Sequence, residues 1–438
     1  MWFSRFFISE AAEVSMTAEK IFNEKEKNGV ILVSVMEKGA DKREAEASFD
    51  ELARLAETAG ASVYARMIQE KEAPDARTYI GSGKVKELAE LCRSGEIHMV
   101  VFDCELTPSQ IKNLEDELEE VQVIDRSMLI LDIFALHAKS GEGKLQVELA
   151  QLKYTVPRLM GHGAQLSRLG GGIGTRGPGE SKLETDRRHV RRRIDALEAE
   201  LASLAKNRTV QRSARERAGI FKVAIAGYTN AGKSTLLGFL TGADILVQDK
   251  LFATLDPTTR RFALPSGEEI LLTDTVGFIR NLPHHLIEAF RSTLDEVRYA
   301  DAILVVIDAS DPEAPAQVQV TKNLIAELDA SDKPMLFVYN KCDLGIAVHP
   351  ATDSGQNVFL SAATGEGVDE LVRRLEALAA DGKRPCEFFF PSDKLGLVAA
   401  LYAGANVTSV EYGDDGAHVL AVCDRKTAGQ LCEYLVRS

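Results

Sequence analysis

Apolar residues occur along the first 125 positions in short runs, separated by stretches with helical spacing. The runs predict strands, and the stretches, where apolar positions recur every three or four residues, predict helices. The predicted strands cover residues 30–35, 62–68, 99–102 and 121–124, and the predicted helices cover residues 44–59, 85–92 and 108–120. Strands that alternate with helices in this way indicate a small α/β domain around a mainly parallel sheet.

Residues 126–217 contain no strand pattern. Apolar residues recur at steps of four and three from Leu145 to Leu159, and the same stepping returns from Val190 to Leu204. Two such seams joined by one loop predict an antiparallel helical hairpin, with two core helices of a compact domain as the alternative. Residues 170–179 between the seams include six glycines, so we expect this segment to form the mobile tip of the hairpin.

The charge distribution sets this hairpin apart from the rest of the chain. The whole chain has a net charge of -14, whereas residues 158–217 contain 14 Lys and Arg against 7 Asp and Glu. The densest basic cluster consists of Arg187, Arg188, Arg191, Arg192 and Arg193. Many charge runs are only a solvated face, but a basic arm on an otherwise acidic chain favours contacts with RNA phosphates.

The remaining sequence predicts two further α/β sections. Residues 383–438 have strand patterns at 386–390, 407–412 and 418–423, a turn at 413–416, and a helix after the first and after the last of these strands. The predicted division is a tail (1–28), an N-terminal α/β subdomain (29–125), the hairpin (126–217), a nucleotide domain (218–382) and a C-terminal α/β domain (383–438). The expected fold class is therefore α/β.

A phosphate-binding loop is predicted where the buried strand at residues 221–226 meets the helix at residues 235–240. The segment between them, GYTNAGKS at residues 227–234, matches the pattern GxxxxGK[ST] in the context that it requires. Its glycines let backbone N–H groups and the helix N-terminus face phosphate oxygens. Lys233 is expected to reach the β- and γ-phosphates, and the Ser234 hydroxyl to bind Mg²⁺.

Two downstream segments are predicted to sense the γ-phosphate. The strand at residues 270–274 ends in a DxxG pattern, in which Asp274 would hold Mg²⁺ through water and the Gly277 N–H would face the γ-phosphate. Between Ser234 and Asp274, Thr254 is the first choice for a threonine that completes the Mg²⁺ shell. Thr258 is the second choice, and a polar turn is the alternative.

Base recognition is predicted at the end of the buried strand that starts at Met335. It delivers NKxD at residues 340–343, where the Asp343 carboxylate can accept from guanine N1–H and the exocyclic amine together. Adenine presents the wrong groups there, and a charged hydrogen bond left unmade costs roughly 1.5–3 kcal/mol. Asn340 can bond the other edge of the base, the Lys341 stem can lie on its face, and the segment at residues 361–363 can offer N–H groups to guanine O6.

These segments define one predicted site for GTP or GDP with Mg²⁺. Lys233, Thr254 and Gly277 are its predicted catalytic residues, and Ser234 and Thr254 its predicted metal ligands. The predicted nucleotide contacts are Gly227, Tyr228, Thr229, Asn230, Ala231, Gly232, Lys233, Ser234, Thr235, Phe252, Ala253, Thr254, Asp274, Thr275, Val276, Gly277, Asn340, Lys341, Asp343, Ser361, Ala362 and Ala363.

With these motifs, the chain resembles the HflX family of translation-associated GTPases over nearly its whole length. The resemblance rests on YIGSGKVKEL at residues 79–88, LQVELAQL at 145–152, GGGIGTRGPGES at 170–181 and FATLDP at 252–257. It supports Thr254 as the switch threonine. It also implies that the large ribosomal subunit and its RNA are partners, that the hairpin reaches toward the peptidyl transferase centre, and that stalled ribosomes are split or rescued.

Other functions stay open at this point. A ribosome-assembly GTPase would differ only in its target, and a GTP-regulated RNA-binding or RNA-remodelling protein would use the basic arm directly. The segment Gly81-Ser-Gly-Lys84 has a superficial likeness to a phosphate loop, but it lacks the full spacing and is interpreted as a turn.

Phe278 occupies the position that follows the DxxG glycine, where related enzymes place a glutamine that orients water. A phenyl ring cannot bind water in this way, so slow intrinsic hydrolysis is expected. The ribosome, or a potassium ion at Asn230 in the phosphate loop, would then supply the missing polarisation.

Cysteine usage and hydropathy predict a cytoplasmic protein. The 6 cysteines form no CxxC pair and no zinc-ligand pattern, as expected in a reducing compartment. No apolar run approaches the ~20 residues that a membrane-spanning helix needs. A monomer is expected.

Overall fold

The computed structural model describes most of the chain from Gly29 onwards. The described residues are 29–39, 41–119, 121–166, 178–217, 220–243, 251–252, 255–350, 355–381, 383–413, 415–424, 427–428 and 431–437. Residues 170–177 of the predicted glycine-rich tip, Ala253 and Thr254 therefore lie outside the described residues, while residues 178–179 of the predicted tip belong to a helix. Their roles remain predictions.

Contacts between residues divide the chain into two compact units. The first unit comprises residues 1–201 together with two short segments, 248–256 and 280–291. The second unit comprises residues 202–247, 257–279 and 292–438. In the sequence the two short segments lie before and after the DxxG residues Asp274 and Gly277, and they group with the N-terminal part of the chain.

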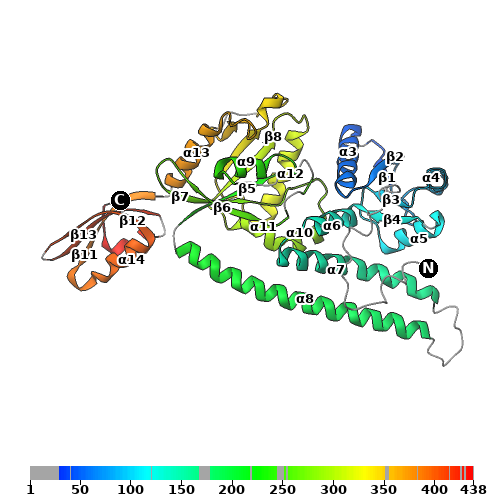
Figure 1. The fold of residues 1–438 in the computed structure, drawn as a ribbon, viewed down its shortest axis with the longest axis horizontal. Coiled ribbons are helices and arrows are strands. Elements are labelled where there is room, and N and C mark those ends of the chain that lie inside the picture. Colours follow the sequence, from blue (N-terminus) through cyan, green and yellow to red (C-terminus); the bar gives the residue numbers. More distant parts are fainter. Residues whose placement is uncertain are drawn as a thin grey trace. The chain divides into compact units, whose positions relative to one another are not determined.

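The first unit begins with a parallel sheet in the order β2-β1-β3-β4. Its core contains the inward faces of β1 and β3 together with apolar residues of α4 and α5. The bounds are β1 Gly29–Glu37, α3 Lys42–Thr58, β2 Ser62–Lys71, α4 Ser82–Ser94, β3 Met99–Phe102, α5 Pro108–Leu118 and β4 Gln122–Asp125 (Figure 1). All seven predicted elements of this part of the chain are confirmed within a few residues.

Local sequence signals fix the helix starts in this sheet domain. Asp41 caps α3 by accepting from the Arg43 N–H, and Thr107 and Gln110 form a reciprocal capping box at α5. The segment Gly81-Ser-Gly-Lys84 is the start of α4 and not a separate turn. Its Lys84 ammonium lies 2.8 Å from Glu87, one turn along the helix.

Three helices follow the sheet, and the described part of residues 126–217 contains no strand. The short helix α6 is buried along most of its length, and α7 and α8 match the two predicted hairpin arms. Glu148 on α7 accepts from Nε and Nη2 of Arg193 on α8, both at 2.7 Å. The bounds are α6 Arg126–His137, α7 Gly141–Leu166 and α8 Pro178–Arg217.

The second unit contains a six-stranded sheet in the order β10-β9-β8-β5-β7-β6. All strands are parallel except β6, which pairs antiparallel with β7. The strands are β5 Phe221–Gly227, β6 Thr258–Ala263, β7 Glu269–Asp274, β8 Ala302–Asp308, β9 Met335–Asn340 and β10 Asn357–Phe359. The helices along this part of the chain are α9 Lys233–Thr241, α10 His284–Ala289, α11 Arg291–Arg298, α12 Ala314–Glu327 and α13 Val368–Asp381.

The C-terminal part is an antiparallel sheet in the order β12-β13-β11-β14, with α14 packed against it. The bounds are β11 Lys383–Pro391, α14 Gly396–Gly404, β12 Ala405–Tyr412, β13 Gly416–Asp424 and β14 Leu435–Arg437. The sequence predicts a helix after the strand at residues 418–423, and residues 427–428 are helical. Residues 432–437 form a short 3-10 turn and then β14, because Leu435 and its neighbours pair with the open edge of β11.

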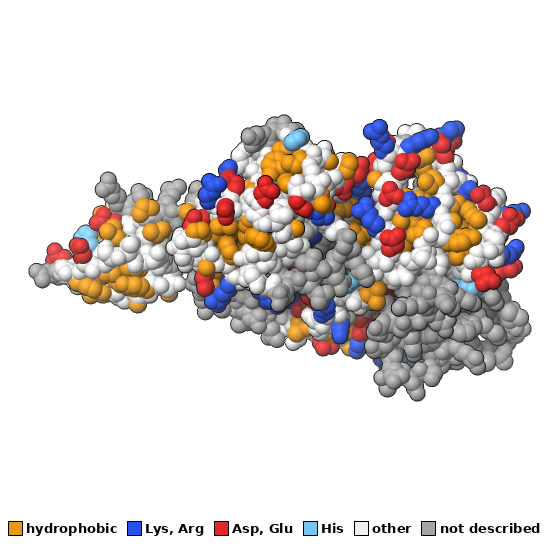
Figure 2. Space-filling model, turned by 45° about the horizontal axis from the view of Figure 1, so that its top comes forward, with side chains coloured by type: hydrophobic (Ala, Val, Ile, Leu, Met, Phe, Trp, Pro, Cys, Tyr) orange, Lys and Arg blue, Asp and Glu red, His pale blue; other side chains and the backbone are white. Residues whose placement is uncertain are grey.

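Outside the hairpin, surface charge and hydropathy do not single out a binding surface among the described residues. On the face drawn in Figure 2, Lys and Arg side chains are interspersed with Asp and Glu over the described surface. No described helix has the length and hydropathy to cross a membrane.

Candidate functional site

The phosphate loop lies where β5 ends and α9 begins, at the carboxyl edge of the parallel strands. Two of its glycines are required by geometry. Gly227 has φ +147° and a Cβ there would collide with the Val306 carbonyl, while Gly232 has φ +92° and a Cβ would collide with the Asn340 amide. Ligands of open α/β sheets bind at this edge, so the loop is placed as the sequence predicts.

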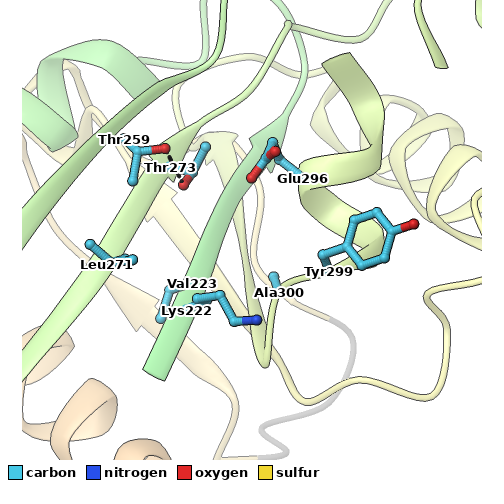
Figure 3. Close-up of a pocket in the computed structure, with 8 residues that line it drawn as sticks. All are labelled: Lys222, Val223, Thr259, Leu271, Thr273, Glu296, Tyr299 and Ala300. Atoms are coloured by element: carbon cyan, nitrogen blue, oxygen red, sulfur yellow. Dashed lines mark hydrogen bonds between the residues drawn. The ribbon is translucent and has the colours of Figure 1, made fainter. Parts of the chain in front are cut away.

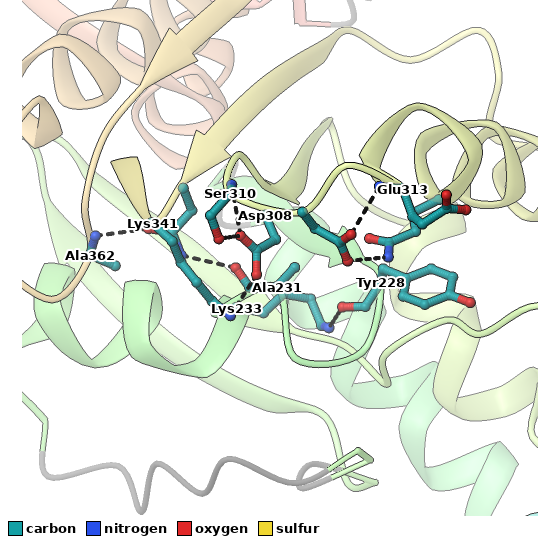
Figure 4. Close-up of polar contacts among 11 residues, drawn as sticks. Tyr228, Ala231, Lys233, Asp308, Ser310, Glu313, Lys341 and Ala362 are labelled. Carbon is teal, nitrogen blue, oxygen red and sulfur yellow. Dashed lines mark hydrogen bonds and ion pairs between the residues drawn. The ribbon is translucent and has the colours of Figure 1, made fainter. Parts of the chain in front are cut away.

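Lys233 is the first residue of α9, and its side chain is 6% exposed. Its Nζ donates to the Tyr228 carbonyl at 2.7 Å, so the ammonium lies within the loop (Figure 4). Burial lowers the pKa of this amine from 10.5 to about 8, with the nearby Asp274 carboxylate acting in the opposite direction. A cation held inside a ring of backbone groups is suited to bind phosphate oxygens.

Ser234 and Asp274 lie side by side at the edge of this loop. The Ser234 hydroxyl donates to Asp274 Oδ2 at 2.6 Å, and the Asp274 side chain is only 1% exposed. Hard oxygen donors of this kind suit Mg²⁺, which takes one or two protein ligands and several waters or phosphate oxygens. The described residues include no group of three or more His, Cys, Asp or Glu that could hold a metal without such help.

Asn340, at the end of β9, ties the loops of the site together. Its Nδ2 donates to the Ala231 carbonyl of the phosphate loop at 2.9 Å, and its Oδ1 accepts from the Ala362 N–H at 2.9 Å. The side chain is 2% exposed. One buried amide therefore fixes the phosphate loop against the segment predicted to contact guanine O6.

Lys341 and Asp343 follow Asn340 at the same edge. Lys341 has φ +63°, and its Nζ lies 2.7 Å from Asp308 Oδ2 at the end of β8 (Figure 4). Asp308 also accepts from the Ser310 hydroxyl and N–H. Asp343 lies in the 3-10 turn Cys342–Leu344 and its side chain is exposed, so its carboxylate is accessible to a base.

The loop after β10 is held by internal backbone bonds. Ser361 is fully buried, its N–H donates to the Glu366 carbonyl at 2.9 Å, and its hydroxyl accepts from the Thr364 N–H. The Ala362 N–H is engaged by Asn340, as described above. Ala363 is the next residue of this loop and is exposed.

The DxxG segment runs directly beside the phosphate loop. Thr275 is buried and its hydroxyl donates to the Ile225 carbonyl, while a Cβ at Gly277 would approach Lys233 Nζ to 3.0 Å. Phe278 is 1% exposed, and its backbone exchanges hydrogen bonds with Gly227 and Thr229 at 3.1 and 2.8 Å. The Phe278 ring is thus committed to the core.

Phe252 and Thr258, two further residues of the predicted site, lie before β6 and at its start. Phe252 is 2% exposed with φ +56°, and its ring packs against Phe134 at 4.7 Å between centroids. Thr258, the second choice for the switch threonine, is the first residue of β6 and pairs with Asp274. The sequence predicted a nucleotide contact at Phe252 but gave no sign of this aromatic packing.

A separate pocket is lined by residues of β5, β6, β7 and α11. Its lining contains the amino-terminal end of β5 and the loop before β8, with Thr259 and Thr273 hydroxyls 3.0 Å apart (Figure 3). None of the predicted nucleotide contacts lines it.

Three family models match consecutive parts of this chain. The family model described as "GTP-binding GTPase N-terminal" matches residues 46–135, "GTP-binding GTPase Middle Region" matches 137–215, and "50S ribosome-binding GTPase" matches 222–341. The "GTPase HflX" of Caldanaerobacter subterraneus subsp. tengcongensis is 48% identical over 94% of this chain and 95% of its own length. The chain belongs to the HflX family of GTPases.

One further relative agrees with this family, and one solved structure is similar to the chain. The "GTPase HflX" of Escherichia coli (strain K12) is 44% identical over 74% of this chain and 77% of its own. A solved structure of a GTP-binding protein from Sulfolobus solfataricus in complex with GDP is 27% identical, covers 81% of this chain and 99% of its own, and has a TM-score of 0.44. As an HflX GTPase, the chain binds and hydrolyses GTP.

The sequence did not predict two contacts that hold the nucleotide site of this HflX GTPase together. Asp308 carries no recognisable motif, and its pairing with Lys341 depends on the neighbouring carboxyl ends of β8 and β9. The bond from Asn340 to Ala231 joins residues 109 positions apart. Asp308 ends the buried strand that precedes the NKxD strand in the sequence, and this position is the signal that could have indicated its pairing with Lys341.

The pKa of Lys233 predicts how GDP binding depends on pH. Phosphates favour the ammonium form, so binding takes up a proton once the free amine begins to titrate near pH 8. We expect the Kd for GDP to rise roughly fourfold between pH 7 and pH 8.5, as a pKa of about 8 requires. Fluorescent GDP titrations measure it. A Lys233→Arg variant, which stays charged, should show no such rise, and an equally flat wild-type profile would contradict the assignment.

Proposed function

We propose that this GTPase is an Mg²⁺-dependent switch that binds the large ribosomal subunit and splits or rescues stalled ribosomes. The observation that carries the switch is the shared framework of the site, in which Asn340 joins the phosphate loop to the guanine-facing loop. GTP would order the segments around Thr254 and Gly277, and hydrolysis would release them.

Guanine selection is assigned to Asp343. Its exposed carboxylate would accept from N1–H and the exocyclic amine of guanine, while adenine offers neither pairing. The Lys341 stem would lie on the base, because its ammonium is already held by Asp308 at 2.7 Å. The predicted O6 contacts were the N–H groups of Ser361 and Ala362, but these donate to the Glu366 carbonyl and to Asn340 Oδ1. The contact with O6 is therefore assigned to the N–H of Ala363, the next residue of the loop.

The Mg²⁺ ion would be held by the Ser234 hydroxyl, with Asp274 in contact through water and Thr254 completing the shell. The closeness of Ser234 and Asp274, at 2.6 Å, supports this donor set. Bound Mg²⁺ neutralises charge that develops on the phosphates during hydrolysis. Lys233 would add a second positive charge at the β- and γ-phosphates.

Hydrolysis by the isolated protein would be slow. Phe278 is buried and its backbone is bonded to the phosphate loop, so it cannot orient the attacking water. The ribosome would then accelerate the reaction by ordering the Thr254 segment. The prediction of potassium dependence rests on Asn230, which has φ +60° in the loop, and it stays a prediction.

The ribosomal partner is supported by two independent features. The family model over residues 222–341 describes a 50S ribosome-binding GTPase. The helical hairpin carries Arg188, Arg191 and Arg192 with exposed side chains on α8. Positive side chains in a row on one helix fit the phosphate backbone of ribosomal RNA.

The base-reading assignment predicts the behaviour of an Asp343→Asn variant. An amide at this position presents an N–H donor toward the exocyclic amine of guanine, whereas xanthine has an acceptor carbonyl there. We expect GDP affinity to fall by about 10–100-fold, the equivalent of one charged hydrogen bond, with affinity for xanthosine diphosphate rising. Competition titrations of both nucleotides measure the change. Unaltered guanine preference would refute the role of Asp343.

Co-sedimentation with ribosomes tests the partner. Wild-type protein with a non-hydrolysable GTP analogue should pellet with large subunits, GDP-bound protein should pellet less, and deletion of residues 170–179 should weaken the complex. A variant with Arg188, Arg191 and Arg192 changed to Gln should bind less and lose salt dependence. Pelleting with precursor subunits alone would favour an assembly GTPase, and RNA unwinding that persists in Lys233→Ala would favour an RNA-remodelling protein.

A further inference from the structure

The Thr229 side chain is a buried polar group in the phosphate loop. Thr229 is 6% exposed, and its Oγ1 is buried with no hydrogen-bond partner among the residues that the structure describes. Buried hydroxyls in proteins nearly always have a partner, because one left without a partner destabilises the fold. The pattern GxxxxGK[ST] leaves this position open, so phosphate binding alone does not demand a threonine here. The unpaired hydroxyl therefore requires another explanation.

The backbone of Thr229 is fixed against the DxxG segment. Its N–H donates to the Phe278 carbonyl at 2.8 Å, and the Phe278 N–H donates to the Gly227 carbonyl at 3.1 Å. Tyr228 and Phe278 form a parallel bridge between the same two segments. These bonds hold the phosphate loop and the DxxG segment side by side, so two segments of one domain set the position of the Thr229 backbone.

The Thr229 side chain lies next to Gly277 and close to Lys233. A Cβ on Gly277 would approach Thr229 Cγ2 to 2.7 Å, Thr229 Cα to 2.9 Å and Lys233 Nζ to 3.0 Å. A side chain at position 277 would therefore clash, and the threonine and the ammonium converge on the same glycine. All three residues belong to the second compact unit. Because the ammonium is expected at the β- and γ-phosphates, the threonine lies at the γ end of the nucleotide.

The Thr229 hydroxyl is available to a group bound at this end of the nucleotide. The methyl carbon Cγ2 is the side-chain atom that lies nearest to the Cβ position of Gly277. Threonine side chains occupy staggered rotamers, and one step of χ1 moves the hydroxyl to the position that another substituent held. Since Oγ1 has no hydrogen bond to another described residue, this step breaks none there.

Hydrolysis needs a group that orients the attacking water, and the usual one is missing. The side chain after DxxG, Phe278, is 1% exposed and cannot bind water. Two other hydroxyls near the phosphate loop are already engaged, because Ser234 donates to Asp274 and Thr275 donates to a backbone carbonyl. The unpaired hydroxyl of Thr229 is therefore the group in this part of the site that can bond to a water at the γ-phosphate.

We propose that Thr229 is a catalytic residue of GTP hydrolysis, whose hydroxyl oxygen accepts a hydrogen bond from the attacking water. The water oxygen forms a bond to the γ-phosphorus while the bond from this phosphorus to the β–γ bridging oxygen breaks, and the electron pair of that bond leaves on GDP. The proton of the water ends on the released phosphate, and the Thr229 hydroxyl keeps its own. The inference rests on the proposed function, in which Lys233 and Gly277 face the γ-phosphate.

The test is single-turnover GTP hydrolysis by the full-length chain with Thr229→Val, which keeps the shape, and Thr229→Ser, which keeps the hydroxyl. The rate constant should fall about tenfold in Thr229→Val, because a hydrogen bond to the reacting water is lost, and should stay within about threefold in Thr229→Ser. The Kd values for GDP and for a non-hydrolysable GTP analogue should change by less than about twofold, because the lost contact is to water and not to the nucleotide.

Thermal melts separate this catalytic role from a structural one. Thr229→Val replaces an unpaired buried hydroxyl with a methyl group, so the Tm should be no lower than that of the wild type. Thr321→Val is the matched control, because Thr321 is 1% exposed and its hydroxyl donates to the Gln317 carbonyl on α12 at 2.9 Å. This control should lower the Tm and leave the rate constant for hydrolysis unchanged.

Two results would overturn the role of Thr229. One is an unchanged rate constant in folded Thr229→Val. The other is an equal loss of affinity for the GTP analogue, because the hydroxyl would then hold the γ-phosphate and not the water. Should Thr229→Val fold poorly, Thr229→Ala, which also lacks the hydroxyl, decides the question by the same measurements.

The Gly277→Ala variant separates this inference from the function on which it rests, since its Cβ would meet both Thr229 and Lys233. If Gly277→Ala is inactive while Thr229→Val hydrolyses GTP at the wild-type rate, the proposed site stands and the role of Thr229 is overturned. If Gly277→Ala hydrolyses GTP at the wild-type rate, the proposed site and the role of Thr229 both fail.

Discussion

The nucleotide site depends on one buried amide at the end of β9. Asn340 donates to the phosphate loop at Ala231 and accepts from Ala362 in the loop after β10. A buried amide left without partners costs about 1–3 kcal/mol, so these loops must adopt their positions together. The glycine at 232 is required by the same contact, because a side chain there would meet the Asn340 amide. Triphosphate binding and base selection are thereby built on one rigid frame.

The segments that precede β6 and follow the DxxG residues in the sequence are held differently. Residues 248–256 and 280–291 group with the N-terminal unit, where Phe252 packs on Phe134 of α6 and Asp256 accepts from the Ser140 N–H just before α7. The frame around Asn340 is a set of short contacts within the sheet domain, whereas these segments are fixed through capping and aromatic contacts in the other unit.

Much of this architecture follows from the sequence, and the exceptions have a common cause. The phosphate loop after β5, DxxG and NKxD are each a short continuous segment, so local sequence patterns predicted these motifs. The parallel strands of the N-terminal sheet are short apolar runs, and local patterns predicted them as well. Phe252 and Asp256 were not recognised as anchors, since their partners lie more than 110 positions away, on α6 and α7. The strand β14 at the C-terminal end was not predicted, because only the open edge of β11 makes a strand there favourable. Contacts distant in sequence decide such positions.

The most direct test of this account is the competition between GTP and ATP for the wild-type protein in the presence of Mg²⁺. Equilibrium titration measures the affinity for each nucleotide. The joined loops and the exposed Asp343 predict that GTP and GDP bind at least about 100-fold more tightly than the adenine nucleotides, the discrimination expected when a site built for polar partners is offered the wrong ones. Equal affinity for ATP, or binding of neither triphosphate, would contradict it.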